Sequence, residues 1–286
     1  MREESNLARG YELTGKVLSA PLPRGYLNYV GRILLALTET LHGLGAFTLI
    51  TLGVAISNAG KKRVIMRPLI RAQIARAGLS VLPLAGFISV AMGVIIVAQT
   101  VYLLNQVGAQ GFVGTVMVTV VVRELGPIIT ALLVLARVGT AAVIDLGTAR
   151  ALGEVESLEA LGIDPIHYAV VPRVFGMAIS IFCLTVYSII IALTSGYLFA
   201  FLQGVSLSPG DYVGQLAGAL RWEDFILLPL KTCGYGVVIA VVTCYQGLAQ
   251  PLSIGDVAKV TTRAVSQAIV GCVLLDLAII VVYLFI

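Results

Sequence analysis

Charged residues are scarce in this sequence, and their scarcity excludes an ordinary water-soluble domain. Only 12% of the 286 residues are Asp, Glu, Lys or Arg, whereas 58% are hydrophobic, and the mean hydropathy is +0.99. A typical globular domain carries about 25% charged residues. The composition therefore predicts an integral membrane protein.

Motifs for metal binding and covalent catalysis are also missing. Four cysteines lie within apolar runs, at spacings that match neither CxxC nor a zinc pattern: Cys183, Cys233, Cys244 and Cys272. We interpret them as packing residues. The two histidines, His42 and His167, are far apart in the sequence, and no arrangement of Ser, His and Asp is evident. We predict no catalytic residue and no metal site.

A phosphate-binding loop of the GxxxxGK[ST] type does not occur either. The nearest stretch, ISNAGKK, has Ala55 in place of the first glycine and Lys62 in place of the Ser or Thr. We therefore predict that the chain binds no cofactor and is not an enzyme. Any ATP hydrolysis coupled to it must take place in another chain.

Five long apolar runs follow residue 78, and each exceeds the roughly 20 residues that a helix needs to cross the bilayer core. We predict spans at 79–105, 115–146, 168–202, 225–249 and 262–286. The sequence lacks alternating segments of about ten residues, which are typical of membrane β-barrels. The predicted fold class is an all-α integral membrane protein with a five-span domain at residues 79–286.

The residues before the first span form two regions. Residues 1–25 carry several charges but no apolar stretch behind a basic start, so we predict a cytoplasmic tail and not a cleaved secretory signal. Residues 26–78 are predicted to be amphipathic helices that lie in the membrane interface or dip into it. Basic residues alternate with apolar ones at helical spacing in the second half of this region: Lys61, Lys62, Arg63, Arg67 and Arg71.

This basic segment predicts the orientation, because Lys and Arg next to spans favour the cytoplasmic side. With the segment in the cytoplasm, residues 147–167 and 250–261 are also cytoplasmic, whereas residues 203–224 and the C-terminus lie outside. The outer loop agrees, since it carries Asp211, Glu223 and Asp224 against a single basic residue, Arg221.

The cytoplasmic stretch GTARALGEVESLEALGIDPIHYAVVPR contains a predicted amphipathic helix at 148–162. Its apolar residues recur at steps of three and four, and its glutamates lie mostly on the opposite face. Gly162 and Pro165 are typical of a helix C-terminal stop. Such a helix either connects two spans or docks into a groove on a motor subunit. The candidate docking residues are Leu152, Glu154, Val155, Leu158, Glu159, Leu161, Gly162, Asp164 and Pro165.

Three stretches closely resemble the signature regions of MlaE-type permeases, the membrane subunits of ABC transporters that work with MCE-domain proteins to move lipids between membranes. They are RELGPIITALLVLARVGTAAVIDLGTARALGEVESLEALGIDPIHYAVVPR, LKTCGYGVVIAVVTCYQG and VTTRAVSQAIVGCVLLD. The resemblance covers residues 65–286. One departure is the pair Glu154 and Val155, where the family usually has Glu and Gln.

The resemblance implies a homodimer of five-span subunits, with two ABC ATPase subunits below it and a ring of MCE domains above. It also implies a phospholipid substrate and, in bacterial relatives, a small STAS-domain regulator. ATP and Mg²⁺ would be bound only by the partner ATPase. The implied location is a bacterial inner membrane or the chloroplast inner envelope, and no nucleic-acid partner is expected.

Four charged residues lie in the outer halves of the predicted spans: Arg123, Glu124, Lys231 and Asp276. At a helix rise of about 1.5 Å per residue, they fall at similar depths in the outer half of the membrane. A charge facing lipid near the centre costs about 2.5 to 3.5 kcal/mol, so they should face the protein interior. Either they form ion pairs that lock helices together, or Arg123 and Lys231 attract a lipid phosphate while the two acids hold these cations in place.

Two other classes of membrane protein are alternatives. A secondary transporter binds its ion near the midplane, typically within a repeated architecture, and no repeat between the halves of this sequence is visible. Intramembrane aspartyl proteases carry a GxGD pattern, whereas the stretch SIGD lacks the first glycine. A secondary transporter or another multi-span protein outside the ABC class is therefore the main alternative.

Overall fold

The computed structural model of the chain describes residues 42–51, 53–54, 63–202, 208–248 and 254–285. The chain divides into two compact units, residues 1–46 and 47–286. Of the first unit only residues 42–46 are described, and they are helical. The tail predicted at 1–25, the first part of the interfacial region, and Lys61 and Lys62 lie outside the described residues.

Five helical stretches among the described residues are long and apolar enough to cross a membrane. They are Met66–Gln106, Val113–Ala151, Ile166–Leu202, Trp222–Leu248 and Val257–Tyr283. Together with the lack of strands in the described part of the chain, they confirm the predicted all-α integral membrane fold. The second stretch has 39 residues. At about 1.5 Å per residue it is far longer than a core about 30 Å thick, so the helices continue beyond the apolar runs.

Several of these stretches are α-helices joined by short π-helical turns. The elements up to residue 151 are α3 (Arg63–Ile74), η1 (Ala75–Leu79), α4 (Leu82–Met92), η2 (Gly93–Val97), α5 (Ala98–Gln106), η3 (Gln110–Phe112), α6 (Val113–Met117), η4 (Val118–Leu125), α7 (Gly126–Val134), η5 (Leu135–Gly139) and α8 (Thr140–Ala151). The later elements are α9 (Glu154–Ala160), η6 (Ile166–Val170), α10 (Val171–Leu202), α11 (Pro209–Ala219), α12 (Trp222–Leu248), η7 (Ile254–Asp256) and α13 (Val257–Phe285). Of the η elements, η3 and η7 are 3-10 turns and the others are π-helical.

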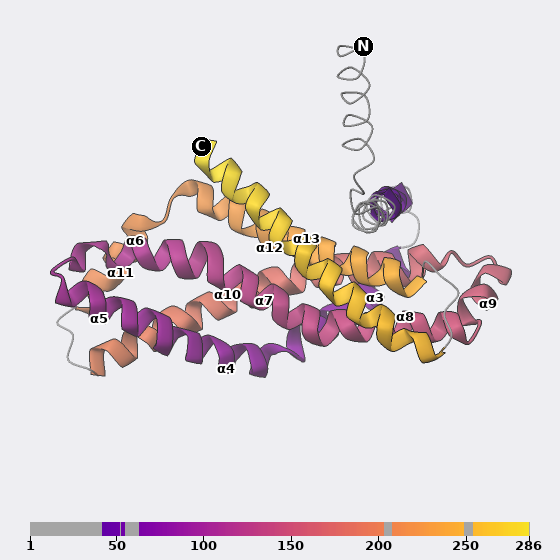
Figure 1. Cartoon of the computed structure of the whole chain (residues 1–286), viewed down its shortest axis with the longest axis horizontal. Coiled ribbons are helices and arrows are strands. Elements are labelled where there is room, and N and C mark those ends of the chain that lie inside the picture. Colours follow the sequence, from indigo (N-terminus) through magenta and orange to yellow (C-terminus); the bar gives the residue numbers. More distant parts are fainter. Residues whose placement is uncertain (1–41, 52, 55–62, 203–207, 249–253, 286) are drawn as a thin grey trace, which may run out of the picture. The chain divides into compact units, whose positions relative to one another are not determined.

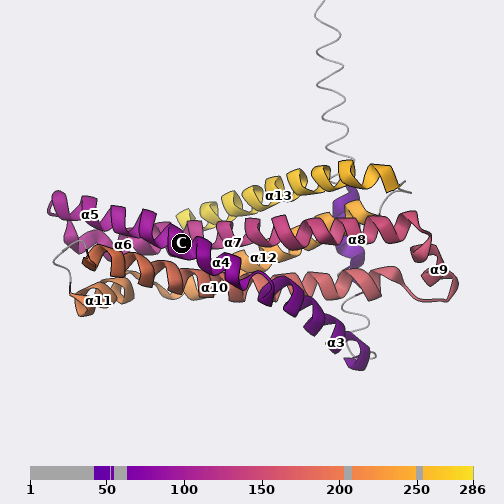
Figure 2. The same cartoon turned by 90° about the horizontal axis from the view of Figure 1, so that it is seen from below.

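Within residues 47–286, α10 is the central helix and contacts α3, α4, α7 and α12, while α12 also packs against α8 and α13. Gly236 lets α12 approach α10 closely, because a Cβ at this position would collide with the backbone of Ala178. Figures 1 and 2 both place α3, α8 and α9 at one end of the bundle and α5, α6 and α11 at the other. We call these the α9 end and the α11 end.

The predicted helix at 148–162 is divided into the last turn of α8 and the short helix α9. The division falls at Gly153, which has a left-handed φ of 74°. At its other end α9 closes with a Schellman motif: the N–H of Gly162 bonds to the carbonyl of Glu159 at 2.9 Å, and the N–H of Ile163 bonds to that of Leu158 at 3.0 Å. Gly162, with φ of 74°, permits this turn, so α9 stops where the glycine signal predicts.

Candidate functional site

The four charged residues predicted to line the lipid pathway come together, and Lys231 lies at their centre. Its Nζ donates hydrogen bonds of 2.9 Å to Glu124 Oε2 and of 2.8 Å to the carbonyl oxygen of Arg123, and it lies 2.5 Å from Asp276 Oδ1 as an ion pair. Three oxygens of its own chain therefore surround the ammonium group of Lys231. Its side chain is only 3% exposed.

Pro127 explains why the carbonyl of Arg123 is available to Lys231. In a regular α-helix this carbonyl would accept the N–H of residue 127, but proline has none. The neighbouring turn η4 is π-helical, and π-helical turns occur frequently at functional sites. The same segment directs Arg123 and Glu124, which are adjacent in sequence, to different partners on α12.

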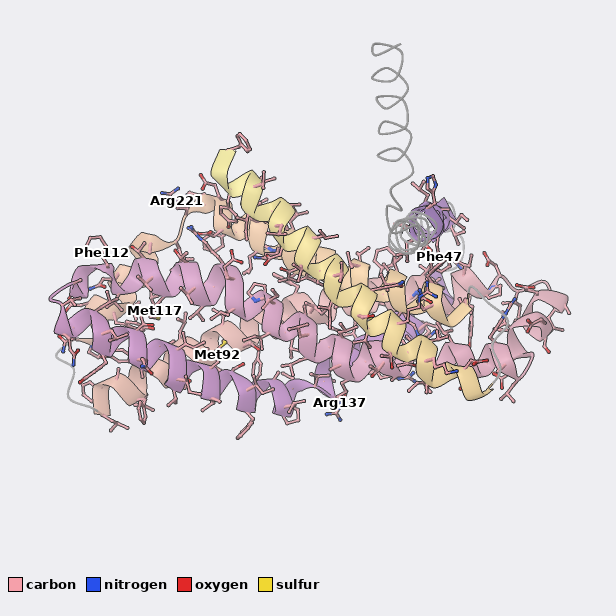
Figure 3. The ribbon with its side chains drawn as sticks, viewed as in Figure 1. Phe47, Met92, Phe112, Met117, Arg137 and Arg221 are labelled. Carbon is pink, nitrogen blue, oxygen red and sulfur yellow. The ribbon has the colours of Figure 1, made fainter. Side chains whose placement is uncertain are left out.

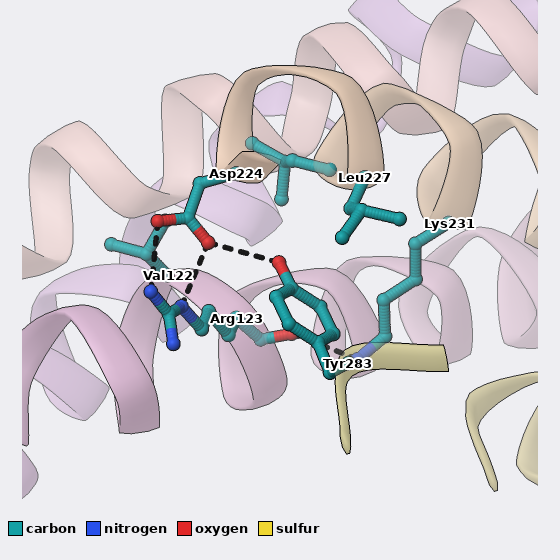
Figure 4. A pocket seen from close by; sticks show the side chains of 7 residues that line it. Val122, Arg123, Asp224, Leu227, Lys231 and Tyr283 are labelled. Atoms are coloured by element: carbon teal, nitrogen blue, oxygen red, sulfur yellow. Dashed lines mark hydrogen bonds and ion pairs between the residues drawn. The ribbon is translucent and has the colours of Figure 1, made fainter. Parts of the chain in front are cut away.

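Arg123 pairs with Asp224, a residue that the sequence prediction placed in the outer loop. Nη2 donates a hydrogen bond of 2.9 Å to Oδ2, and Nε lies 2.8 Å from Oδ1 as an ion pair without hydrogen-bond geometry. The backbone N–H of Arg221 and the hydroxyl of Tyr283 each donate to Asp224 at 2.9 Å. Arg123 Cζ also lies 5.4 Å from the ring centroid of Tyr283, a cation–π contact. Figure 4 shows the contacts of Asp224 with Arg123 and Tyr283 from close by.

Tyr235 completes the arrangement by donating a hydrogen bond of 2.8 Å to Asp276 Oδ1. We call the whole set the span network: Arg123, Glu124, Asp224, Lys231, Tyr235, Asp276 and Tyr283. Spacings of seven and four residues put three of its members on one face of α12, and a spacing of seven puts two on one face of α13. Sequence reasoning missed Asp224, Tyr235 and Tyr283. The seven-residue spacing between Asp224 and Lys231 was a signal that could have found the first of them.

Only one edge of the span network is open to a ligand. Arg123 Nη1 has no hydrogen-bond partner among the described residues, and the Arg123 side chain is 21% exposed. The space between Arg123, Asp224, Lys231 and Tyr283 has a volume of about 10 Å³. That is room for about one water molecule and none for a lipid. A ligand can therefore reach the outward edge of Arg123 but not the interior of the network.

The residues predicted to dock a motor protein differ in exposure. Val155 is buried at 5% and Leu158 is half-buried, so this side of α9 packs against its own chain, including α8. Leu152 and Leu161 are 58% and 75% exposed. The exposed acids around them are Glu154, Glu156, Glu159 and Asp164. The α9 surface, which we define as Leu152, Leu161, Ile163 and these acids, is thus apolar with an acidic rim.

Two of the predicted interfacial basic residues, Arg67 and Arg71, are exposed on α3. They are four residues apart and so lie on the same face of the helix. Arg63 is the first residue of α3.

Five apolar helices, three of which are joined by a charged network, define a multi-pass membrane protein. The family model described as Permease MlaE matches residues 70–282. The chain therefore belongs to the MlaE permease family, whose members are membrane subunits of ABC transporters.

Several known proteins are similar to this chain over most of its length. A protein of Rickettsia prowazekii (strain Madrid E), named "Probable ABC transporter permease protein", is 30% identical over 224 residues, which cover 78% of this chain and 85% of the relative. The chloroplastic protein TRIGALACTOSYLDIACYLGLYCEROL 1 of Arabidopsis thaliana is 28% identical over 71% of this chain and 58% of its own length. The intermembrane phospholipid transport system permease protein MlaE of Haemophilus influenzae is 27% identical over 62% of this chain and 68% of its own length.

Proposed function

We propose that this chain forms the membrane pathway through which an ABC transporter moves phospholipid between two membranes. Family membership supports the transporter class, and the name of the Haemophilus relative supports the substrate. In this proposal two copies of the chain work with two separate ATPase subunits, which bind ATP and Mg²⁺. An MCE-domain protein receives or delivers the lipid, a STAS-domain protein regulates the complex, and the complex lies in an inner membrane.

The observation that carries the phospholipid part is the open edge of Arg123. A guanidinium pairs with phosphate oxygens through parallel charge-assisted hydrogen bonds, and Nη1 is the group of the span network with donors to spare. The ammonium group of Lys231 is buried among oxygens of its own chain, so Lys231 acts as a positioning residue. Together with Glu124 and Asp276 it holds η4, α12 and α13 at the spacing that presents Arg123.

The small volume of the space between the side chains of the span network limits where a lipid can bind. About 10 Å³ cannot hold a phospholipid headgroup, so the lipid must lie against Arg123 from outside the single chain. The side chain of Glu124, the neighbour of Arg123 in η4, is also 36% exposed. We infer that the second copy of the chain supplies the opposite wall of the lipid site.

The α9 surface is the proposed contact for the ATPase. Leu161 and Leu152 supply an exposed apolar centre, and the acidic rim can pair with basic groups around a groove. The short helix α9 follows a left-handed glycine and ends in a Schellman motif, so it is a short and well-defined connection between two spans. A movement of the ATPase subunit would be transmitted through α9 to the neighbouring elements α8 and η6.

Purification of the full chain together with its genomic ATPase partner tests the proposal. We expect the two proteins to co-purify, ATP hydrolysis to depend on the chain, and mass spectrometry to find bound phospholipid. The complex in proteoliposomes should move phospholipid to an acceptor only when ATP is present. Purification without an ATPase, or transport driven by an ion gradient without ATP, would refute the proposed function.

A further inference from the structure

Three arginines line a cleft near the α9 end that has no part in the span network. Arg76 lies in η1, Arg137 in η5 and Arg173 in α10, and Asp145 of α8 lines the same cleft. The cleft has a volume of about 150 Å³, and the polar side chains of Gln73 and Ser80 also line it. We call this site the arginine cleft. It has roughly ten times the space needed for one water molecule.

The positive charges of the arginine cleft are not compensated. Arg76 Nη1 and Arg173 Nη2 lie 3.9 and 3.8 Å from the same oxygen of Asp145, so they share one carboxylate at the outer limit of an ion pair. Arg137 is exposed and has no acidic partner among the residues that the structure describes. Three guanidinium groups against one carboxylate leave a formal excess of two positive charges.

Arg137 is the residue that most needs an explanation. It lies inside the predicted span 115–146, nine residues before the end of that span, which is about 14 Å along the helix. An unpaired cation at such a depth is costly in lipid and marks a functional site by default. Figure 3 shows its side chain projecting from the edge of the bundle. There it can meet a ligand that approaches from the membrane or from water.

The arginine cleft is separate from the proposed lipid contact at Arg123. Residues 123 and 137 are fourteen positions apart, which is about 21 Å along the helix. The cleft lies toward α8 and α9, the end that the distribution of basic residues assigns to the cytoplasm. Its existence does not depend on the function proposed above.

We propose that the arginine cleft is a second anion site, which binds a phosphate group at the cytoplasmic side of the membrane. Guanidinium groups match phosphate oxygens in geometry and charge, and two excess positive charges match a phosphate monoester. The shared ligand chemistry is a phosphate group that can carry two negative charges, either as the monoester headgroup of an anionic lipid such as phosphatidic acid or as inorganic phosphate. Asp145 competes with this ligand for Arg76 and Arg173 and keeps both side chains in place when the cleft is empty.

Native mass spectrometry of the full chain, released from phosphatidylcholine nanodiscs that contain a little phosphatidic acid, tests this site. Wild-type protein should retain phosphatidic acid, and Arg137→Gln should lower the retention about tenfold, as expected for the loss of a charged hydrogen-bonding partner. Asp145→Asn should raise it about two- to fivefold, because it removes a competing carboxylate. The matched control is Arg263→Gln, an exposed arginine of α13 outside the cleft, which should change nothing.

The opposite signs of the two variants separate a binding site from a structural one. If the arginines and Asp145 only stabilised the fold, Asp145→Asn would lower both the melting temperature and lipid retention, and the proposal would be wrong. If retention of phosphatidic acid depends on Arg137 and inorganic phosphate competes with it, the ligand is the lipid headgroup. Binding of phosphate alone that depends on Arg137 identifies the free anion. If neither depends on Arg137, or if Arg137→Gln lowers only the fraction of dimer, no anion site exists here.

Discussion

The span network and the arginine cleft lie within the same bundle of spans but differ in how their charged groups are paired. In the network, Lys231 and Arg123 face three carboxylates at 2.5 to 2.9 Å, and the central ammonium group is surrounded by oxygens of its own chain. In the cleft, Arg76 and Arg173 share one carboxylate at 3.8 to 3.9 Å, and Arg137 has no acidic partner among the described residues. Buried charge that is fully paired holds helices together, whereas charge in excess of its partners is available to a ligand. A basic residue in a span therefore has to be judged by its spare donors and not by its charge.

The largest effect is expected from breaking the span network at Lys231. Lys231→Met leaves Asp276 and Glu124 without their cation between α12, α13 and η4, and loss of one partner of a buried pair costs about 3 to 5 kcal/mol. The melting temperature and the yield in detergent should fall sharply. Lys259→Met, at an exposed lysine of α13, is the matched control and should leave both unchanged. Equal stability of the two variants would show that the network does not hold the spans.

A similar contrast applies to the apolar residues of α9, some of which pack within the chain while others are exposed. Leu161→Asp alters a side chain that is 75% exposed, so the fold should be unaffected. If Leu161 is a central contact of the ATPase, the change should cost about 2 kcal/mol or more of binding free energy, which is a loss of affinity of about thirtyfold or more. Binding of the ATPase to the chain in nanodiscs measures this. Val213→Asp, at an exposed valine of α11, should bind normally, and normal binding by Leu161→Asp would remove α9 from the interface.

A small effect is expected from Tyr283→Phe, which removes one of several donors to Asp224. The carboxylate keeps Arg123 and the backbone N–H of Arg221, so the loss should be about 1 kcal/mol of unfolding free energy. Thermal unfolding measures it against Tyr168→Phe, an exposed tyrosine of η6. A loss as large as that of Lys231→Met would mean that Asp224 depends on the tyrosine and not on the arginine.

Apolar runs and the rise of a helix were sufficient to predict five spans and to bring Arg123, Glu124, Lys231 and Asp276 to one depth. They could not predict that Arg123 pairs with Asp224 and not with Glu124. That choice depends on the rotation of α12 about its axis relative to η4, which is set by side-chain packing. Asp224 was assigned to a loop because it stands just before an apolar run, although it lies in the first turn of α12.

The arginine cleft was beyond sequence reasoning for a similar reason. Arg76, Arg137 and Arg173 come from three elements, and no spacing in the sequence links them. Only the packing of the helices brings Arg76 and Arg173 to one aspartate and places Arg137 at the same cleft. The division of the predicted coupling helix at Gly153 was missed because a helical periodicity continues across the break.

The most direct test is a charge-balanced double variant, Arg123→Gln with Asp224→Asn. It removes the ligand-binding edge of Arg123 together with the buried carboxylate, so no unpaired charge remains. We expect a melting temperature close to that of the wild-type protein, with co-purified phospholipid and ATP-dependent transport both lowered about tenfold. A stable double variant that binds and transports phospholipid at the wild-type level would contradict recognition of the lipid phosphate by Arg123.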